Sequence, residues 1–296
     1  MMARVVVADG LDAEAISMLK QRYGAVAVKP TELPLELADA EILIVRSKTK
    51  VNKELLALAP KLKAVARAGV GMDNIDVPEC EKRGVKAFNT PDASTNAVAE
   101  FTVALMLALA RRVPYADCSM KGKRWEKDAL QGTELSGKSI GIVGYGRIGS
   151  SVADRLRAFG CKILAFSLEY LKEPGNAEVV SLEDLLKRAD FVTLHIPLTE
   201  QTRNLISRER MALMKRSAYI VNTSRGEVLD LEALHDALIN NRLAGAAIDV
   251  FPHEPYSGDL CALKNAIITP HIAGSTHEGQ ARIGMQIVET LATIVP

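Results

Sequence analysis

Short apolar runs alternate with segments of helical periodicity along the whole chain. A short apolar run predicts a buried strand of a parallel sheet, whereas apolar residues three or four positions apart predict a helix. The strands expected first are Val5–Ala8, Ile42–Val45, Ala64–Ala66 and Val85–Phe88, with helices such as Ala13–Lys20 and Lys53–Leu58 between them. This alternation predicts an open parallel sheet with helices on both faces.

The turn-forming stretch Asn89–Ser94 interrupts the alternation and predicts a hinge. A long helix, Asn96–Arg111, should lead from it into a second sheet. The strands of that sheet are expected at Lys162–Phe166, Phe191–Leu194, Tyr219–Asn222, Gly245–Asp249 and Ile267–Thr269, after a first strand before Gly144. The helices are expected at Ser151–Phe159, Leu182–Lys187, Arg208–Met214 and Glu232–Asn240.

We therefore expect two domains. A substrate domain should span residues 1–95, and a dinucleotide-binding domain should span residues 96–275. The last helical segment, Thr276–Ile294, should pack back on the first domain, so that residues 276–296 complete it. The fold class is α/β, with two doubly wound parallel sheets.

The second sheet begins at Ser139–Gly149, which reads S-I-G-I-V-G-Y-G-R-I-G. An apolar run precedes Gly144, Gly146 and Gly149, and a helical pattern follows them. In such a strand–turn–helix unit, the first glycine makes the turn, the second lets the backbone approach a pyrophosphate, and the third allows close packing. Glycines also mark ordinary turns, but this context favours a dinucleotide site at the start of the helix.

The residue that would read the ribose of the dinucleotide is unusual. An acidic side chain normally follows the second strand of the unit. Here Ser167 stands at that position, and Glu169 lies two residues further along. The nearest cation for a 2′-phosphate is Lys172, and no arginine stands beside Ser167. We expect NAD as the cofactor, and this pattern leaves NADP open.

Composition narrows the class of protein. A length of 296 residues favours two domains. The content of 48% hydrophobic residues is that of an ordinary globular protein. The net charge of +1 provides no excess of basic residues for binding nucleic acid or an anionic membrane. The four cysteines are far apart, which argues against a disulfide framework or a metal site and fits a reducing cytoplasm. The most apolar run, Phe101–Ala110, is too short to span a bilayer and predicts a buried helix.

Three residues that follow expected strands could carry chemistry: Arg225 in N-T-S-R-G, Glu254 in D-V-F-P-H-E-P and His271 in T-P-H-I-A-G-S-T. An imidazole exchanges protons near neutral pH, a carboxylate beside it favours its protonated form, and a guanidinium binds a substrate carboxylate. Oxidation of an alcohol by hydride transfer requires these parts. Taken singly, each could also be a surface or capping residue.

The other histidines are expected to have different places. His195 ends a strand and should border the nucleotide rather than transfer protons. His235 is expected on the surface, and His253 and His277 in loops. Polar clusters that follow strands of both domains place the expected site in a cleft between them.

In these motifs the sequence resembles the D-isomer-specific 2-hydroxyacid dehydrogenases, and within that family the phosphoglycerate dehydrogenases. The resemblance covers nearly the whole chain, in the motifs V-R-S-K-T-K (45–50), A-R-A-G-V-G-M-D-N-I-D (66–76), G-Y-G-R-I-G (144–149), N-T-S-R-G-E (222–227), D-V-F-P-H-E-P (249–255) and T-P-H-I-A-G-S-T (269–276). It implies a Rossmann-type nucleotide-binding domain inserted into a flavodoxin-like substrate domain. It also implies a homodimer joined through the cofactor domains, with residues 111–138 near the interface.

The resemblance assigns a role to each matching residue. His271 would donate or accept the proton, Glu254 would be its partner, and Arg225 would anchor the carboxylate and polarise the carbonyl. Arg147 and Ile148 would contact the pyrophosphate through the backbone. The whole expected cofactor set is Val70, Gly144, Gly146, Arg147, Ile148, Gly149, Ser167, Pro197, Thr223, Asp249 and His271, of which Val70, Pro197, Thr223 and Asp249 line the nicotinamide half. The substrate set is Arg46, Arg67, Gly69 and Arg225.

The activity that the resemblance implies is NAD-dependent oxidation of 3-phospho-D-glycerate in serine synthesis, because Arg46 and Arg67 suit a phosphorylated acid. The alternatives are a glyoxylate or hydroxypyruvate reductase, another D-2-hydroxyacid dehydrogenase, and a dinucleotide-sensing, corepressor-like binding protein. Formate oxidation is disfavoured, because the family members with that activity pair their histidine with a glutamine, and Glu254 occupies that position here. The serine-sensing domain of long phosphoglycerate dehydrogenases has no counterpart in this sequence, so we expect no serine feedback through such a domain.

Overall fold

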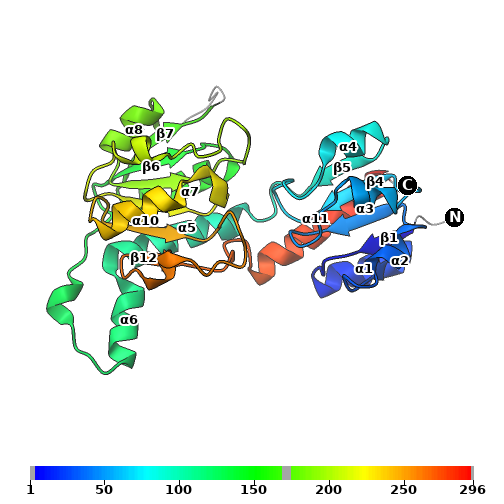
Figure 1. Ribbon diagram of the computed structural model, residues 1–296, viewed down its shortest axis with the longest axis horizontal. Coiled ribbons are helices and arrows are strands. Elements are labelled where there is room, and N and C mark those ends of the chain that lie inside the picture. The colour runs from blue at the N-terminus through cyan, green and yellow to red at the C-terminus, as the bar shows by residue number, and fades with distance from the viewer. Residues whose placement is uncertain (1–3, 169–174, 295–296) are drawn as a thin grey trace. The chain divides into compact units, whose positions relative to one another are not determined.

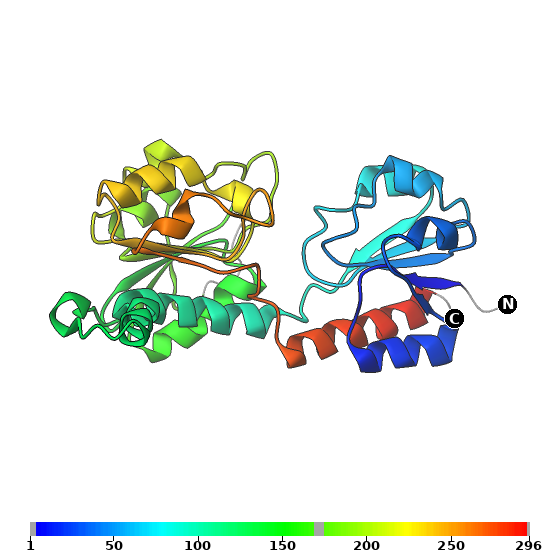
Figure 2. The ribbon, with the colours of Figure 1, turned by 60° about the horizontal axis from the view of Figure 1, so that its bottom comes forward.

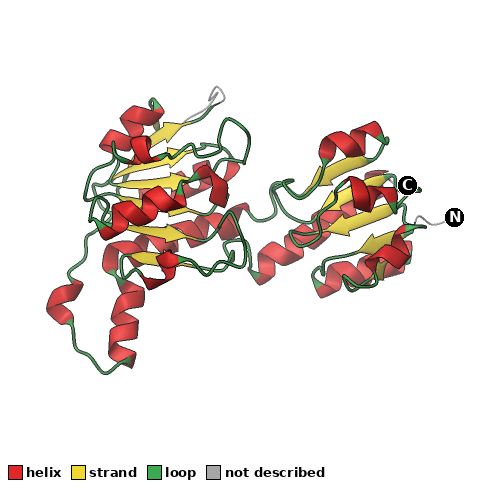
Figure 3. Ribbon diagram, viewed as in Figure 1, coloured by secondary structure: helices red, strands yellow, loops and turns green. Residues whose placement is uncertain are grey.

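The computed structural model describes residues 4–168 and 175–294, and the chain divides into two compact units. The first unit comprises residues 1–95 and 274–296, and the second comprises residues 96–273. Each unit has one sheet with helices packed on it (Figure 3).

The first unit contains a five-stranded parallel sheet in the order β2-β1-β3-β4-β5. Its strands are β1 (Val5–Val7), β2 (Val26–Ala27), β3 (Ile42–Val45), β4 (Ala64–Arg67) and β5 (Lys86–Asn89). This is the flavodoxin-like order, which confirms the expectation for this part of the chain.

Both faces of this sheet are covered, because successive side chains of a strand point to opposite sides. Val5 and Val7 pack on one side with α1 (Ala13–Tyr23) and α11 (His277–Ile294), which lie side by side (Figure 2). Val6 packs on the other side, with the helices α2 (Leu33–Leu37), α3 (Lys53–Ala57) and α4 (Val77–Lys82). The closing helix thus belongs to the core of the first unit, as its apolar pattern predicts.

The second unit contains a seven-stranded parallel sheet in the order β12-β11-β10-β9-β6-β7-β8. Its strands are β6 (Ser139–Val143), β7 (Lys162–Phe166), β8 (Glu178–Val179), β9 (Phe191–Leu194), β10 (Tyr219–Asn222), β11 (Gly245–Ile248) and β12 (Ala266–Ile268). This is the Rossmann order with one more strand at the edge, and the direction of the strand order reverses between β6 and β9. The predicted fold class is therefore confirmed.

Helices cover the two faces of this sheet (Figure 1). Ile140 and Ile142 pack with α5 (Thr95–Arg111) and α7 (Arg147–Ala158), whereas Val143 packs with α8 (Leu182–Arg188) and α10 (Leu231–Ile239). The described part of this unit also contains α6 (Val113–Lys121), α9 (Arg208–Met211) and 3₁₀ turns at Lys127–Leu130, Gly226–Val228 and Asp259–Ala262. The apolar run within α5 is largely buried, and among the described residues no helix is long and apolar enough to cross a membrane.

Some elements were not predicted, and others were predicted with the wrong bounds. Strands β2 and β8 were not predicted, because two exposed residues at a sheet edge leave no apolar run. Helix α7 begins at Arg147 rather than Ser151, since Gly149 lies inside its first turn. Helix α9 ends at Met211 rather than Met214, because the N–H groups of Leu213 and Met214 bond three residues back instead of four. His277 opens α11 and is not a loop residue.

Candidate active site

The glycine turn after β6 is shaped by close contacts. Gly144 has φ +94°, and a Cβ there would lie 2.5 Å from the carbonyl oxygen of His195. A Cβ on Gly149 would collide with the carbonyl oxygen of Gly144, whereas one on Gly146 would meet nothing within 4 Å. Within residues 4–168 and 175–294, no side chain forms a capping hydrogen bond at Gly146, where α7 starts. The turn therefore combines tight packing, an open approach and the start of a helix, which fits the pyrophosphate of a dinucleotide.

The other residues expected around the cofactor lie on several elements. Arg147 and Ile148 form the first turn of α7, and Ser167 follows β7 directly. Pro197 is exposed after β9. Val70 belongs to the first unit, where its carbonyl oxygen accepts a hydrogen bond from the amide of Asn89. Glu169 and Lys172 lie outside the described residues.

His195 is held as a neutral ring beside the glycine turn. Burial lowers its pKa to about 3, so it is uncharged near neutral pH. Its Nε2 lies 3.0 Å from the Thr193 hydroxyl oxygen, and its Nδ1 is buried without a hydrogen bond to the described residues. His195 is therefore poorly suited to exchange protons, as its position after a strand led us to expect.

A buried asparagine holds the turn that carries Arg225. Asn222 ends β10 and is fully buried, and its Oδ1 accepts hydrogen bonds from the Ser224 N–H (3.0 Å) and hydroxyl (2.8 Å). Its Nδ2 donates to the carbonyl oxygen of Arg225 at 2.8 Å. Arg225 Nη1 donates to the Ser224 carbonyl oxygen at 2.6 Å. In the same turn, the Thr223 hydroxyl lies 3.0 Å from that of Thr102 on α5.

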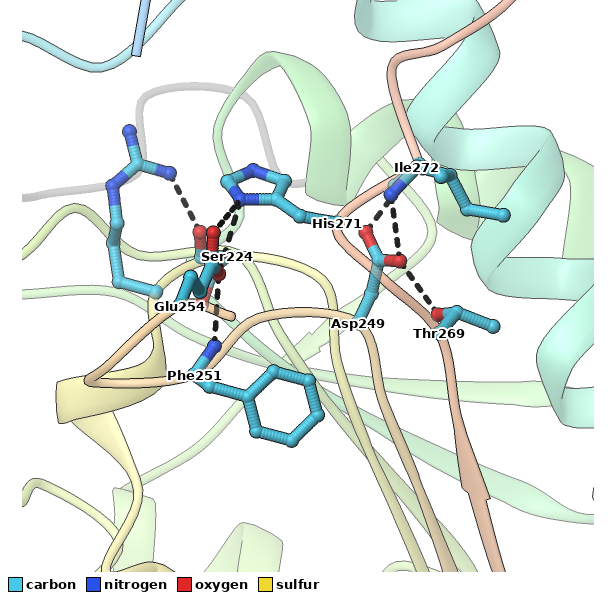
Figure 4. Close-up of polar contacts among 9 residues, drawn as sticks. Ser224, Asp249, Phe251, Glu254, Thr269, His271 and Ile272 are labelled. Atoms are coloured by element: carbon cyan, nitrogen blue, oxygen red, sulfur yellow. Dashed lines mark hydrogen bonds and ion pairs between the residues drawn. The ribbon is translucent and has the colours of Figure 1, made fainter. Parts of the chain in front are cut away.

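A buried aspartate holds the turn that carries His271. Asp249 is fully buried, and its carboxylate accepts hydrogen bonds from the Thr269 hydroxyl (2.6 Å) and from the N–H groups of Ile272 and Ala273 (both 2.9 Å) (Figure 4). Its carbonyl oxygen accepts the N–H of His271 at 2.9 Å. His271 itself has φ +54°, a left-handed conformation that these four bonds fix. Asp249 was expected beside the nicotinamide, and the structure gives its carboxylate three partners within the protein.

His271 and Glu254 form a pair at this sheet edge. The Nδ1 of His271 lies 3.0 Å from Glu254 Oε2 and 3.1 Å from Oε1. The Phe251 N–H donates to the same carboxylate at 3.1 Å, so that Glu254 lies between Phe251 and His271 (Figure 4). The two side chains are 42% and 39% exposed, so ligands can reach them. With Nδ1–H directed at Glu254, the Nε2 of His271 is left to accept a proton.

The expected substrate residues Arg46, Arg67 and Gly69 lie in the first unit. Val45 and Arg67 are register partners in β3 and β4, so Arg46 and Arg67 reach the same edge of the sheet. Gly69 has φ +147°, and a Cβ there would collide with the Arg67 guanidinium. Gly69 thus lets the Arg67 side chain lie flat against the backbone.

Sequence reasoning missed the residues that hold these turns. Asn222 and Thr102 were not singled out, although each is a polar residue within a buried apolar segment. Such a residue needs a hydrogen-bond partner, and this is the signal that could have found them. Among the described residues, no cluster of three or more histidine, cysteine or acidic side chains could hold a metal ion.

A Rossmann-type unit with a histidine–carboxylate pair at the carboxyl edge of its sheet is the arrangement of a nicotinamide-dependent dehydrogenase. Residues 103–273 match the family model described as D-isomer specific 2-hydroxyacid dehydrogenase, NAD binding domain. This match spans more than half of the chain, which therefore belongs to the D-isomer specific 2-hydroxyacid dehydrogenase family.

Individual relatives agree on the family and differ in substrate. A hydroxypyruvate reductase of Thermotoga maritima is 42% identical, and the alignment covers 97% of each chain. A D-3-phosphoglycerate dehydrogenase of Methanocaldococcus jannaschii is 43% identical over 99% of this chain, which spans only 58% of that relative. A crystal structure of D-lactate dehydrogenase from Aquifex aeolicus with NAD and lactic acid superimposes with a TM-score of 0.88 at 31% identity, covering 99% of this chain and 95% of that one.

Proposed function

We propose that this dehydrogenase oxidises 3-phospho-D-glycerate to 3-phosphohydroxypyruvate with NAD, as the first step of serine synthesis in the cytoplasm. The observation that carries the proposal is the placement of Arg46 and Arg67 at one edge of the first sheet. Guanidinium groups are well suited to a phosphate, and a lactate-sized acid has no second anion for them to bind.

The chain's own residues account for the proton and the orientation of the substrate. Bound NAD supplies the acceptor for the hydride that leaves the second carbon of the acid. His271 takes the hydroxyl proton at Nε2, and Glu254 stabilises the imidazolium that forms. Arg225 pairs with the substrate carboxylate and polarises the new carbonyl.

The test is a substrate panel with wild type and Arg46→Ala. We expect 3-phosphoglycerate to have a higher kcat/KM than glycerate, with NAD preferred to NADP. Arg46→Ala should raise the KM for 3-phosphoglycerate about tenfold or more, which is the range for loss of one charge-assisted contact. The KM for glycerate should be the same in the variant as in the wild type. Equal kcat/KM values for 3-phosphoglycerate and glycerate, or an unchanged KM for 3-phosphoglycerate in the variant, would reject the proposed substrate.

A hydroxypyruvate reductase is the second candidate. The relative from Thermotoga maritima favours it, since that protein matches this chain over nearly the full length of both. This candidate predicts rapid reduction of hydroxypyruvate and glyoxylate and little effect of Arg46→Ala. The same panel, run in the reducing direction with NADH and NADPH, separates the two candidates.

A further inference from the structure

The turn that carries Arg46 lies where the strand order of the five-stranded sheet reverses. Strands β1 and β3 are neighbours there, with β2 on the far side of β1. In open α/β sheets, ligands bind outside the carboxyl ends of the strands at such a switch point. Asp9 follows the end of β1, and Arg46 directly follows β3. The two residues therefore meet at the position where this fold accepts ligands.

Asp9 fixes the N–H groups of the turn. Its side chain is almost completely buried, with 7% of the residue exposed. Its Oδ2 accepts hydrogen bonds from the N–H groups of Arg46 (2.7 Å) and Thr49 (3.0 Å), and its Oδ1 accepts the Thr49 hydroxyl at 2.8 Å. A carboxylate that accepts three donors restrains both ends of a four-residue turn.

Asn74 fixes the carbonyl groups of the same two residues. Its Nδ2 donates to the carbonyl oxygen of Arg46 at 2.7 Å and to that of Thr49 at 2.6 Å. Asn74 lies in the loop after β4, so the turn is held from two neighbouring loops. Ser47 and Lys48, between the two held residues, remain exposed.

The Arg46 side chain is half-buried, and no residue in the described ranges forms an ion pair with it. A guanidinium in this state is available to an anion, and its position depends on the backbone that carries it. We propose that Asp9 and Asn74 are positioning residues that hold Arg46 toward the distal anion of the substrate. This inference rests on the proposed function, which assigns Arg46 to the phosphate.

The central test is Asp9→Asn, which keeps the size of the side chain. An asparagine offers one acceptor oxygen for the two N–H groups, and its amide nitrogen then faces the Thr49 hydroxyl, which must accept instead of donate, while all three hydrogen bonds lose the negative charge. We expect the KM for 3-phosphoglycerate to rise about tenfold, while kcat and the KM for NAD change less than about twofold. The KM for glycerate should stay unchanged. Asn74→Asp, which replaces the donor by an acceptor, should give the same pattern.

A double-mutant cycle separates positioning from general damage. If Asp9 acts through Arg46, Arg46→Ala with Asp9→Asn should raise the KM no further than Arg46→Ala alone. Asp12→Ala is the matched control, because Asp12 caps α1 in the same unit through the N–H groups of Glu14 and Ala15. It should lower the thermal stability of the unit without raising the KM for 3-phosphoglycerate.

The outcomes distinguish this inference from the proposed function. If Arg46→Ala leaves the KM for 3-phosphoglycerate unchanged, the proposed substrate is wrong. If Arg46→Ala raises that KM while Asp9→Asn and Asn74→Asp both retain the wild-type value, only the positioning role is wrong. Equal increases in the KM values of 3-phosphoglycerate, glycerate and NAD would also overturn it. Thermal unfolding, monitored by circular dichroism, shows whether Asp9→Asn or Asn74→Asp has lost its fold. If one of them has, the KM values of the other variant test the positioning role.

Discussion

His271 adopts a left-handed backbone conformation, which costs a residue with a Cβ roughly 1–2 kcal/mol. The carboxylate and carbonyl oxygen of Asp249 compensate through four hydrogen bonds to residues 269–273. The ring then meets Glu254 through Nδ1 alone, so that Nε2 faces away from its partner. A strained residue held in this way fits a group that must present one atom to a ligand.

Removal of the imidazole should abolish proton transfer and leave the NAD site intact. We expect His271→Ala to lower kcat by about 10²–10⁴-fold, the usual contribution of a general base. NADH affinity, measured by fluorescence titration, should change little. His253→Ala is the matched control, because His253 is an exposed histidine one residue before Glu254. Near-full turnover in His271→Ala would reject the proposed base.

Local motifs were sufficient to predict Arg225, Glu254 and His271 as candidates, because each follows a strand in a recognisable pattern. Their catalytic roles remain predictions. Asn222 and Asn74 were not predicted. The structural role of a buried side-chain amide depends on which backbone carbonyl groups the fold brings within hydrogen-bond distance of it. Those partners can lie 25 or more residues away, as the Asn74 bonds to the turn at Arg46 demonstrate.

Among the elements, the strand–turn–helix unit from β6 to α7 contains two glycines, Gly146 and Gly149, that should respond differently to an added methyl group. A Cβ at Gly149 collides with the backbone at Gly144, whereas Gly146 has open space around it. Gly149→Ala should therefore lower the melting temperature of the protein. Gly146→Ala should fold normally and bind NADH more weakly, because the new methyl group obstructs the approach of the pyrophosphate.

Differential scanning calorimetry without cofactor and fluorescence titration with NADH measure the two effects separately. A stable Gly149→Ala variant would mean that helix and strand can move apart at no cost. Unchanged NADH affinity in Gly146→Ala would mean that the cofactor does not approach this backbone.

Most elements were predictable because the buried strands are continuous apolar runs. Strands β3, β7, β9 and β10 have the bounds that their runs predict. The two-residue strand β8 was not predictable, because its pairing with β7 is a tertiary contact and its residues are exposed. Helix α6 was also missed, since most of its residues are exposed and give little periodic signal.

For the whole molecule, the half-buried His195, whose Nδ1 atom is fully buried, predicts a loss of stability in acid. Its pKa is about 3 in the folded chain and about 6.5 in an unfolded one, so only the unfolded chain takes up this proton between those values. The unfolding free energy should fall as the pH drops through this window, by up to about 1.4 kcal/mol per pH unit from this group.

Urea unfolding at pH 7, 5.5 and 4.5 measures this dependence. His195→Gln, which cannot titrate, should show a shallower decline than wild type over the same range. Equal declines in the two proteins would show that His195 does not contribute to acid sensitivity.

The segment from α6 to the 3₁₀ turn Lys127–Leu130 extends beyond the sheet of the second unit (Figure 1). It exposes Val113, Met120 and Trp125, and Trp125 is 78% exposed. Large exposed apolar side chains on one protruding segment are typical of an interface, so we expect a homodimer that buries them.

Analytical ultracentrifugation of wild type should give the mass of a dimer. Trp125→Glu should shift the distribution toward monomer. Leu35→Glu is the control, because Leu35 is 82% exposed on α2, which belongs to the first unit rather than the second. A monomeric wild type, or a dimer insensitive to Trp125→Glu, would contradict the expectation.

Helix α11 supplies Ile283, Ile287, Val288 and Leu291 to the core of a sheet whose strands all come from residues 5–89. During translation, the early strands therefore remain incompletely covered on one face until residues 277–294 have been synthesised. Residues 96–273 leave the ribosome before α11, while that face carries α1 but not yet α11. A chain stalled before α11 would expose the apolar residues that this helix normally covers, and we expect such a chain to be bound by chaperones.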